Sequence, residues 1–201
     1  MVFAGEFLEA ANQHGLGERL DRYVLIHAMR AIRHQANARM RLTINLTANS
    51  LVSQTLLPWL TQELQRQQQS PRQIIVQVSE VDFLSAPGQS RLFCTQVRAL
   101  GFELSLTHFG CSLDPFRMLG EVQAEFVKLD RSLLQNIDKD SRQRERLHEL
   151  VGALHGQGIR VIAPMLEDLA LLPILWQANV SFVQGNCLQP PAEYMNFGLF
   201  N

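Results

Sequence analysis

Hydrophobic and polar positions along the chain switch between a helical period and a strand period. Apolar residues recur at helical spacing over residues 7–11 and, after a glycine-containing turn at 15–17, over residues 20–32. This spacing predicts two amphipathic helices. Residues 41–47 then alternate polar and apolar side chains and are rich in β-branched types, which predicts a strand. A helix is predicted to follow from about residue 49 to 67.

The same alternation continues to the end of the chain. Further strands are predicted at 74–80, 103–109, 126–130, 160–164 and 181–188, and further helices at 90–100, 115–119, 132–155 and 166–179. Short connections between helices and strands indicate parallel strands with helical crossovers, so the predicted class is α/β. Six such strands fit either a barrel or a doubly wound sheet, and periodicity does not choose between them.

Composition limits the domain count and the classes of partner. With 201 residues, 46% hydrophobic and 18% charged, the chain is expected to form a single domain over residues 1–201. Its formal net charge of -1 gives no electrostatic reason to expect a nucleic-acid partner. The polar cluster at 65–71 and the charged run at 138–146 are interpreted as solvated loops and helix faces.

The cysteines and the hydropathy pattern bear on the cellular setting. Cys94, Cys111 and Cys187 are odd in number and form no CxxC pair, so neither a disulfide framework nor a zinc site is suggested. A reducing, cytoplasmic setting fits this usage. No stretch approaches the roughly 18 consecutive apolar residues of a membrane span, so none is expected.

A candidate site lies at the end of the strand predicted at 103–109. The apolar run at 104–106 leads into Thr107-His108-Phe109-Gly110, which carries polar side chains but no acid. Histidine has an intrinsic pKa suited to proton transfer. A histidine at a strand end is nevertheless interpreted here as a satisfied polar side chain and not as a general base.

Several segments, in chain order, resemble the EAL domain of cyclic-di-GMP phosphodiesterases. They are residues 7–11 with 15–16, 44–47, 76–80, 109–110, 127–130 and 183–185. Residues 175–178 and 188–190 most resemble the FimX-type branch of type IV pilus regulators. The resemblance implies a TIM-barrel-like α/β fold with its site at the carboxyl ends of the strands. In active members, two divalent metals activate the water that opens cyclic di-GMP.

The resemblance also implies which site residues are kept and which are lost. Asn45 matches the family's metal-binding asparagine, whereas Gln77 stands where the family has an acidic metal ligand. Thr107 and His108 replace an aspartate pair, and Pro164 replaces a glutamate. Hard divalent cations need such acidic oxygens, so we expect no catalytic residues, no metal ligands, no cofactor and no enzyme activity. A softer metal held by His108 and Cys111 is the less favoured alternative, because the neighbouring amides are weak zinc ligands.

The retained polar residues are expected to bind ligand. They are Asn45, Glu80, Lys128, Glu167 and Gln184. Other interpretations stay open for some of them: Lys128 and Asp130 share a strand face and fit ion pairs with neighbours. Glu80 and Glu167 also fit loop braces or helix caps, because acids are stabilised near the NH groups of a helix start.

The family's Glu-Ala-Leu signature has no counterpart in this chain, since it lies on a strand upstream of Gly5. The fold is therefore expected to be incomplete at the N-terminus, with about six of the eight barrel strands. The arginine that follows the signature and grips a ligand phosphate is expected to be absent as well. A barrel that lacks strands exposes an edge, so we expect pairing with upstream residues, self-association through the open edge, or a partner protein.

Three functions follow from the resemblance. The first is a catalytically inactive signalling module that binds cyclic di-GMP and acts through protein partners. The second is a protein-interaction module that no longer uses the nucleotide, which the losses at the site favour. The third and least favoured is residual cyclic-di-GMP phosphodiesterase activity.

Overall fold

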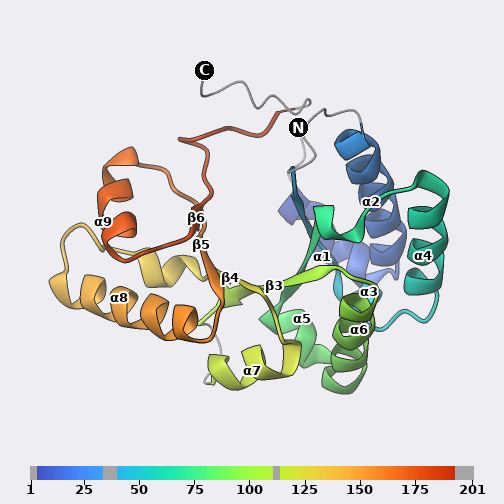
Figure 1. Cartoon of the computed structure of the whole chain (residues 1–201), viewed down its shortest axis with the longest axis horizontal. Helices are drawn as coiled ribbons and strands as arrows, with labels where there is room; N and C mark the ends of the chain where they lie inside the picture. Colours follow the sequence, from blue (N-terminus) through green and yellow to red (C-terminus); the bar gives the residue numbers. More distant parts are fainter. Residues whose placement is uncertain (1–3, 34–39, 111–113, 193–201) are drawn as a thin grey trace. The chain divides into compact units, whose positions relative to one another are not determined.

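The computed structural model describes residues 4–33, 40–110 and 114–192 (Figure 1). The chain divides into two compact units, Met1–Phe126 and Val127–Asn201. Cys111, one of the residues weighed above as a metal ligand, lies outside the described residues.

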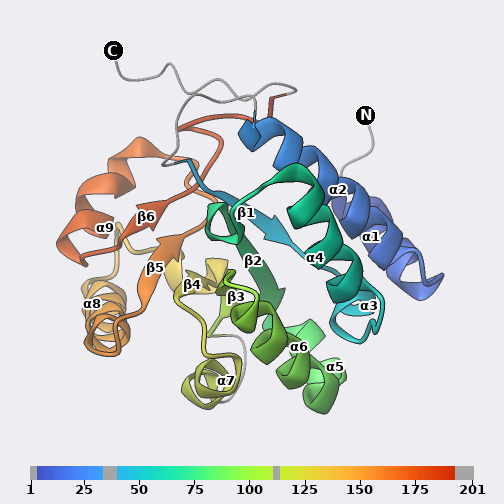
Figure 2. The same cartoon turned by 45° about the vertical axis from the view of Figure 1, so that its right-hand side comes forward.

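The first unit alternates helices with three complete strands. Its elements are α1 (Ala4–Gln13), α2 (Gly17–Arg33), β1 (Leu42–Asn45), α3 (Ala48–Leu51), α4 (Leu56–Gln67), η1 (Pro71–Gln73), β2 (Ile74–Ser79), α5 (Glu80–Ser85), α6 (Pro87–Ala99), β3 (Glu103–Phe109) and α7 (Pro115–Val122). The strand order is β1-β2-β3, and both pairings are parallel. Figure 2 shows these strands side by side, with α2 next to α4.

The core of the first unit lies around β2 and β3. The first five residues of β2 are buried, and so are Leu104, Ser105, Leu106 and Thr107 of β3. Strands that are buried on both faces are typical of parallel sheets covered by helices. Fully buried side chains of α2 and α4, such as Leu25 and Leu60, complete this core.

The second unit contains β4 (Phe126–Leu129, which begins at the last residue of the first unit), η2 (Arg131–Leu134), α8 (Ser141–Gly156), β5 (Arg160–Ala163), η3 (Leu169–Leu171), α9 (Leu172–Gln177) and β6 (Phe182–Val183). Its strand order is β4-β5-β6. β5 and β6 are parallel, with Ile162 opposite Phe182 and Ala163 opposite Val183. The predicted α/β class with parallel strands is confirmed in the described pairings.

Backbone hydrogen bonds join the loop after β5 to the loop after β6. The amide of Gln184 donates to the carbonyl of Ala163 at 2.9 Å, and the amide of Leu166 donates to the carbonyl of Gln184 at 2.9 Å. Gly185 permits this approach, because a Cβ there would lie 2.0 Å from the carbonyl oxygen of Leu166. The two loops of the second unit are therefore hydrogen-bonded to each other and closely packed.

Several predicted elements were wrong in extent. The helix expected over 166–179 is shortened to α9 (Leu172–Gln177), preceded by η3 (Leu169–Leu171). The helix expected over 49–67 is broken between α3 and α4, where the Ser53 hydroxyl accepts hydrogen bonds from the amides of Thr55 and Leu56. The helix expected over 132–155 begins only at Ser141, where the Asp140 carboxylate caps it. The strand expected over 181–188 ends at Val183, because the next peptide groups bond to the loop after β5.

Cysteine burial and helix length add two observations. Cys94, on α6, is 1% exposed. No helix in the described ranges combines the length and the apolar character needed to cross a bilayer.

Cys94 is expected to resist alkylation in the folded chain. Burial raises the pKa of its thiol to about 12, so the reactive thiolate is scarce at pH 8. Treatment with iodoacetamide followed by peptide mass spectrometry should show Cys94 unmodified in buffer and modified in urea. Equal labelling in both conditions would contradict this burial.

Gly185→Ala is expected to destabilise the chain by about 1–3 kcal/mol, since the new methyl group would meet the Leu166 backbone, which cannot rotate away. Urea unfolding followed by circular dichroism measures this change. Gly152→Ala, in α8, is the matched control because nothing lies within 4 Å of its Cβ position. The control should be neutral or stabilised by up to about 1 kcal/mol, as expected for alanine in a helix. Equal stability of the two variants would be incompatible with the tight loop contact.

Candidate functional site

The first group of site residues forms a row across β1, β2 and β3. Asn45 lies opposite Gln77, and Gln77 lies opposite Ser105. Residues paired in this way point to the same face of a sheet. The Gln77 side-chain amide donates to the Ser105 hydroxyl at 3.3 Å, and both side chains are buried, whereas Asn45 is exposed. The structure therefore brings Asn45 and Gln77 together and adds Ser105, which the sequence interpretation missed.

A second polar pair lies one step further along β2 and β3. Ser79 is opposite Thr107, whose hydroxyl donates to the carbonyl of Val78 at 3.5 Å. The Ser79 hydroxyl accepts from the amides of Val81 and Asp82 and so caps α5. His108 follows Thr107 with an exposed side chain and a φ of 58°, a backbone region uncommon for residues other than glycine.

Acidic residues near this end of the first unit belong to helices. Glu80 is the first residue of α5 and is 1% exposed. Asp82, also on α5, has its pKa raised by burial and by the charge of Asp21, while His108 has the opposite effect. These carboxyl groups follow the strand end, whereas the row itself carries amides and hydroxyls.

Lys128 lies on β4 and is half-buried. Burial lowers the pKa of its ammonium group, because a charged group is costly to remove from water. Asp130 follows β4, and its carboxylate caps η2 by accepting from the Ser132 amide at 2.9 Å. Partial burial of an ammonium group costs free energy unless an anion or another polar partner interacts with it.

The other site residues of the second unit lie in the two joined loops. Pro164 is buried directly after β5, and Glu167, three residues later, is exposed. Gln184 is exposed directly after β6, and its backbone is fixed by the bonds to Ala163 and Leu166 described above. The structure thus joins the loop of Glu167 to the loop of Gln184 through their backbones.

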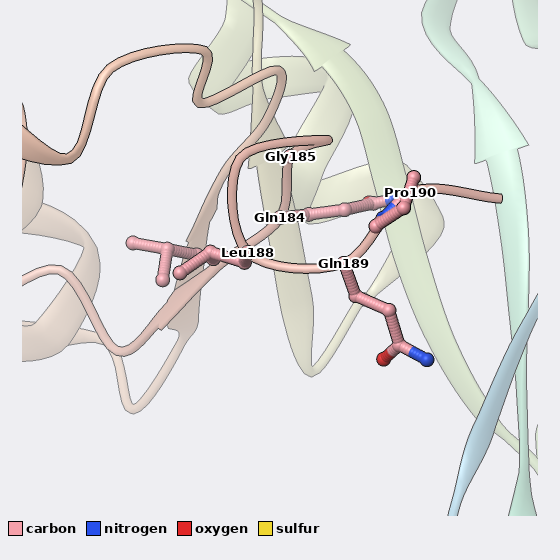
Figure 3. A pocket seen from close by; sticks show the side chains of 6 residues that line it. Gln184, Gly185, Leu188, Gln189 and Pro190 are labelled. Atoms are coloured by element: carbon pink, nitrogen blue, oxygen red, sulfur yellow. The ribbon is translucent and has the colours of Figure 1, made fainter. Parts of the chain in front are cut away.

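A pocket of about 300 Å³ lies at the loop that follows β6 (Figure 3). It is lined by Val183, Gln184, Gly185, Leu188, Gln189 and Pro190. In Figure 3 the Gln184 side chain points toward Pro190, whereas the Gln189 side chain points away from the loop. The lining thus combines the side chains of Gln184 and Gln189 with the apolar side chains of Val183, Leu188 and Pro190.

The donor set does not fit the two-metal site that the resemblance implies. Asn45, Gln77, Ser105 and Thr107 are neutral, and hard divalent cations prefer carboxylate oxygens. Within residues 4–33, 40–110 and 114–192, no three His, Cys, Asp or Glu side chains gather as metal ligands. What the row offers is hydrogen bonding by amides and hydroxyls.

Ser105 was missed because it stands inside an apolar run of sequence. A two-residue period places Glu103, Ser105 and Thr107 on one face of β3, and this signal was available from the sequence. Its pairing with Gln77 depends on the register between β2 and β3, and a single sequence does not reveal that register. Asp21 and Asp82 gave no comparable signal, because Asp21 is an acid on a predicted helix and Asp82 lies between the strand predicted at 74–80 and the helix predicted at 90–100.

Comparisons with known proteins agree with this architecture. The chain is 32% identical to the FimX EAL domain from Pseudomonas aeruginosa, whose crystal structure bound to c-di-GMP superposes with a TM-score of 0.91 and covers 98% of this chain and 79% of that chain. Another crystal structure of a FimX EAL domain is 33% identical, with a TM-score of 0.91, over 98% of this chain and 80% of that chain. The described strands thus match a TIM-barrel-like fold, as predicted, with six strands in the described residues.

Curated relatives are longer proteins. Cyclic di-GMP phosphodiesterase PdeF of Escherichia coli is 22% identical over 95% of this chain and 26% of its own length. The chain spans about a quarter of the length of the curated relatives it matches. The sequence model of the family described as "EAL domain" matches residues 1–191. The chain therefore belongs to the EAL domain family.

Proposed function

We propose that residues 1–201 form one EAL domain that binds cyclic di-GMP without hydrolysing it and acts through protein partners. The observation that carries this proposal is the row of Asn45, Gln77 and Ser105, in which the Gln77 amide, at a position where the resemblance implies an acidic metal ligand, donates a hydrogen bond to the Ser105 hydroxyl. The similar FimX EAL domain from Pseudomonas aeruginosa, described as bound to c-di-GMP, supports the choice of nucleotide.

Loss of hydrolysis follows from charge. Two divalent cations must be partly dehydrated when they bind, and anionic ligands offset that cost. Gln77, Thr107 and His108 provide no fixed negative charge where the family has acids. Pro164 has a side chain that neither ligates a metal nor accepts a proton. These four residues therefore do not hold the metal ions that would activate a water molecule.

Nucleotide binding needs a different set of groups. Amides and hydroxyls donate hydrogen bonds to phosphate oxygens, and the Lys128 ammonium adds an opposite charge. The exposed Gln184 and Gln189 amides offer both a donor and an acceptor, which suits the edge of a guanine base. Glu80 and Glu167 complete the proposed set, Glu80 as a buried brace and Glu167 as an exposed acid that suits base NH groups.

A protein partner is supported by an apolar surface in the second unit. Residues 169–176 are consecutive apolar residues, and only Leu175 among them is buried. Leu169 and Trp176 are 52% and 63% exposed. Contiguous exposed apolar side chains are typical of protein interaction sites. The same observation favours the second candidate function, a protein-interaction module that no longer uses the nucleotide.

Isothermal titration of the purified chain with cyclic di-GMP, with and without magnesium, separates these functions. Binding that is independent of magnesium, with no linear product by chromatography, is expected. Absence of binding in both buffers would favour the nucleotide-independent module. Magnesium-dependent formation of linear product would overturn both proposals and restore a phosphodiesterase.

Affinity for cyclic di-GMP is expected to fall as the pH rises through the lowered pKa of Lys128. The unbound ammonium loses its proton below the ordinary value of 10.5, and a bound phosphate favours the protonated form. At pH values between the pKa of Lys128 in the free chain and its higher pKa in the complex, the complex holds more protons than the free chain. Binding therefore weakens as the pH rises through this range. Calorimetry in buffers of different ionisation heat measures both the affinity and the proton uptake.

Lys128→Met should lower the affinity about tenfold or more, the loss expected for a charged hydrogen bond, and should abolish the proton uptake. Lys139→Met is the matched control, because the Lys139 side chain is 80% exposed and lies near Asp138. The control should bind as the unchanged chain does. An equal loss of affinity in both variants would point to general electrostatics and exclude a specific role of Lys128.

A further inference from the structure

A buried carboxylate on α2 accepts three hydrogen bonds from the turn that follows β1. Asp21 is 3% exposed, and its Oδ2 accepts from the Thr47 amide at 2.8 Å, the Thr47 hydroxyl at 2.7 Å and the Ser50 hydroxyl at 2.6 Å. Burial raises the pKa of Asp21, although these three bonds oppose the rise. A buried carboxylate is costly, and converging donors offset that cost.

These bonds to Asp21 come from the turn just after Asn45, a residue proposed to bind the ligand. Thr47 is two residues beyond Asn45 and precedes α3, yet its side chain makes no cap bond to that helix. Its hydroxyl is used by Asp21 instead. From the other side, the Leu46 amide donates to the carbonyl of Gln77 at 3.1 Å. The strand end is thus held between β2 and α2.

A second link ties the same turn to the connection between α1 and α2. The Gly17 amide donates to the Asn49 side-chain oxygen at 3.0 Å, and the Asn49 amide group donates to the carbonyl of Asn12 at 3.3 Å. A Cβ at Gly17 would lie 2.4 Å from the Thr47 hydroxyl oxygen. The helical connection therefore packs directly on the turn after β1, at a distance that only glycine allows.

A buried hydrogen-bond network whose members are satisfied rigidifies the segments that it joins. We propose that Asp21 is a positioning residue, which acts through Thr47 and Ser50 to hold the Asn45 side chain in its orientation for the ligand. This inference rests on the proposed binding of cyclic di-GMP. By linkage, a ligand that binds Asn45 also stabilises the contacts around Asp21.

Hydrogen exchange and calorimetry on the whole chain test this role. Asp21→Ala should speed exchange of the amides of residues 46–50 about tenfold or more without nucleotide, and should weaken cyclic di-GMP binding about tenfold, as expected for lost hydrogen bonds to a charged group. Asp21→Asn keeps an acceptor oxygen for the Thr47 amide, so it should have a smaller effect on both measurements.

A double-mutant cycle with Asn45→Ala distinguishes positioning from general destabilisation. If Asp21 acts through Asn45, Asp21→Ala should cost no further affinity in the Asn45→Ala background. Additive losses would overturn the proposal. Glu63→Gln is the matched control, because Glu63 is a buried carboxylate whose bonds lie within α4, to Arg66 and Gln67. It should leave exchange at 46–50 and nucleotide affinity unchanged.

Failure of the proposed function gives a different pattern from failure of this inference. If the unchanged chain binds no cyclic di-GMP, the function fails, but faster exchange at 46–50 in Asp21→Ala still supports the constraint on the strand end. Unchanged exchange in a folded Asp21→Ala overturns the inference whatever the affinity. Ser50→Ala removes one of the three bonds and gives the same two readouts if the Asp21→Ala chain does not fold.

Discussion

The parallel register of β1, β2 and β3 is the constraint on which the candidate site depends. Side chains alternate between the two faces of each strand, so the register that buries Ile44, Val76 and Leu104 on one face also aligns Asn45, Gln77 and Ser105 on the other. A slip of one residue would exchange the two faces and place the apolar set where the polar row now lies. Burial of the apolar face therefore holds the polar row in place.

This alignment decides the chemistry available to the first unit. Where neutral amides and hydroxyls meet, they satisfy each other, as Gln77 and Ser105 do. Such a row supplies hydrogen bonds to an oxygen-rich ligand but no charge to hold divalent cations. After β1, the buried Asp21 side chain accepts hydrogen bonds from Thr47 and Ser50, through which we propose that it orients the end of this strand.

Periodicity in the sequence was sufficient to find the strands, because buried parallel strands are short apolar runs between polar turns; the strand at Glu103–Phe109 agrees residue for residue. Predictions failed where side chains bond to the backbone. Ser53 interrupts a predicted helix, and Asp140 begins another one late. The Gln77–Ser105 contact joins residues 28 positions apart, so it depends on a register that a single sequence does not reveal.

Manganese binding measured by electron paramagnetic resonance tests most directly whether the neutral row has lost its metals. The free Mn²⁺ signal should be the same for cyclic di-GMP with the chain as for cyclic di-GMP alone. The row has no acidic ligand to offset the free-energy cost of dehydrating the ion. Loss of signal equal to about two ions per chain, the stoichiometry of a two-metal site, would contradict this account if Asn45→Ala restored the signal.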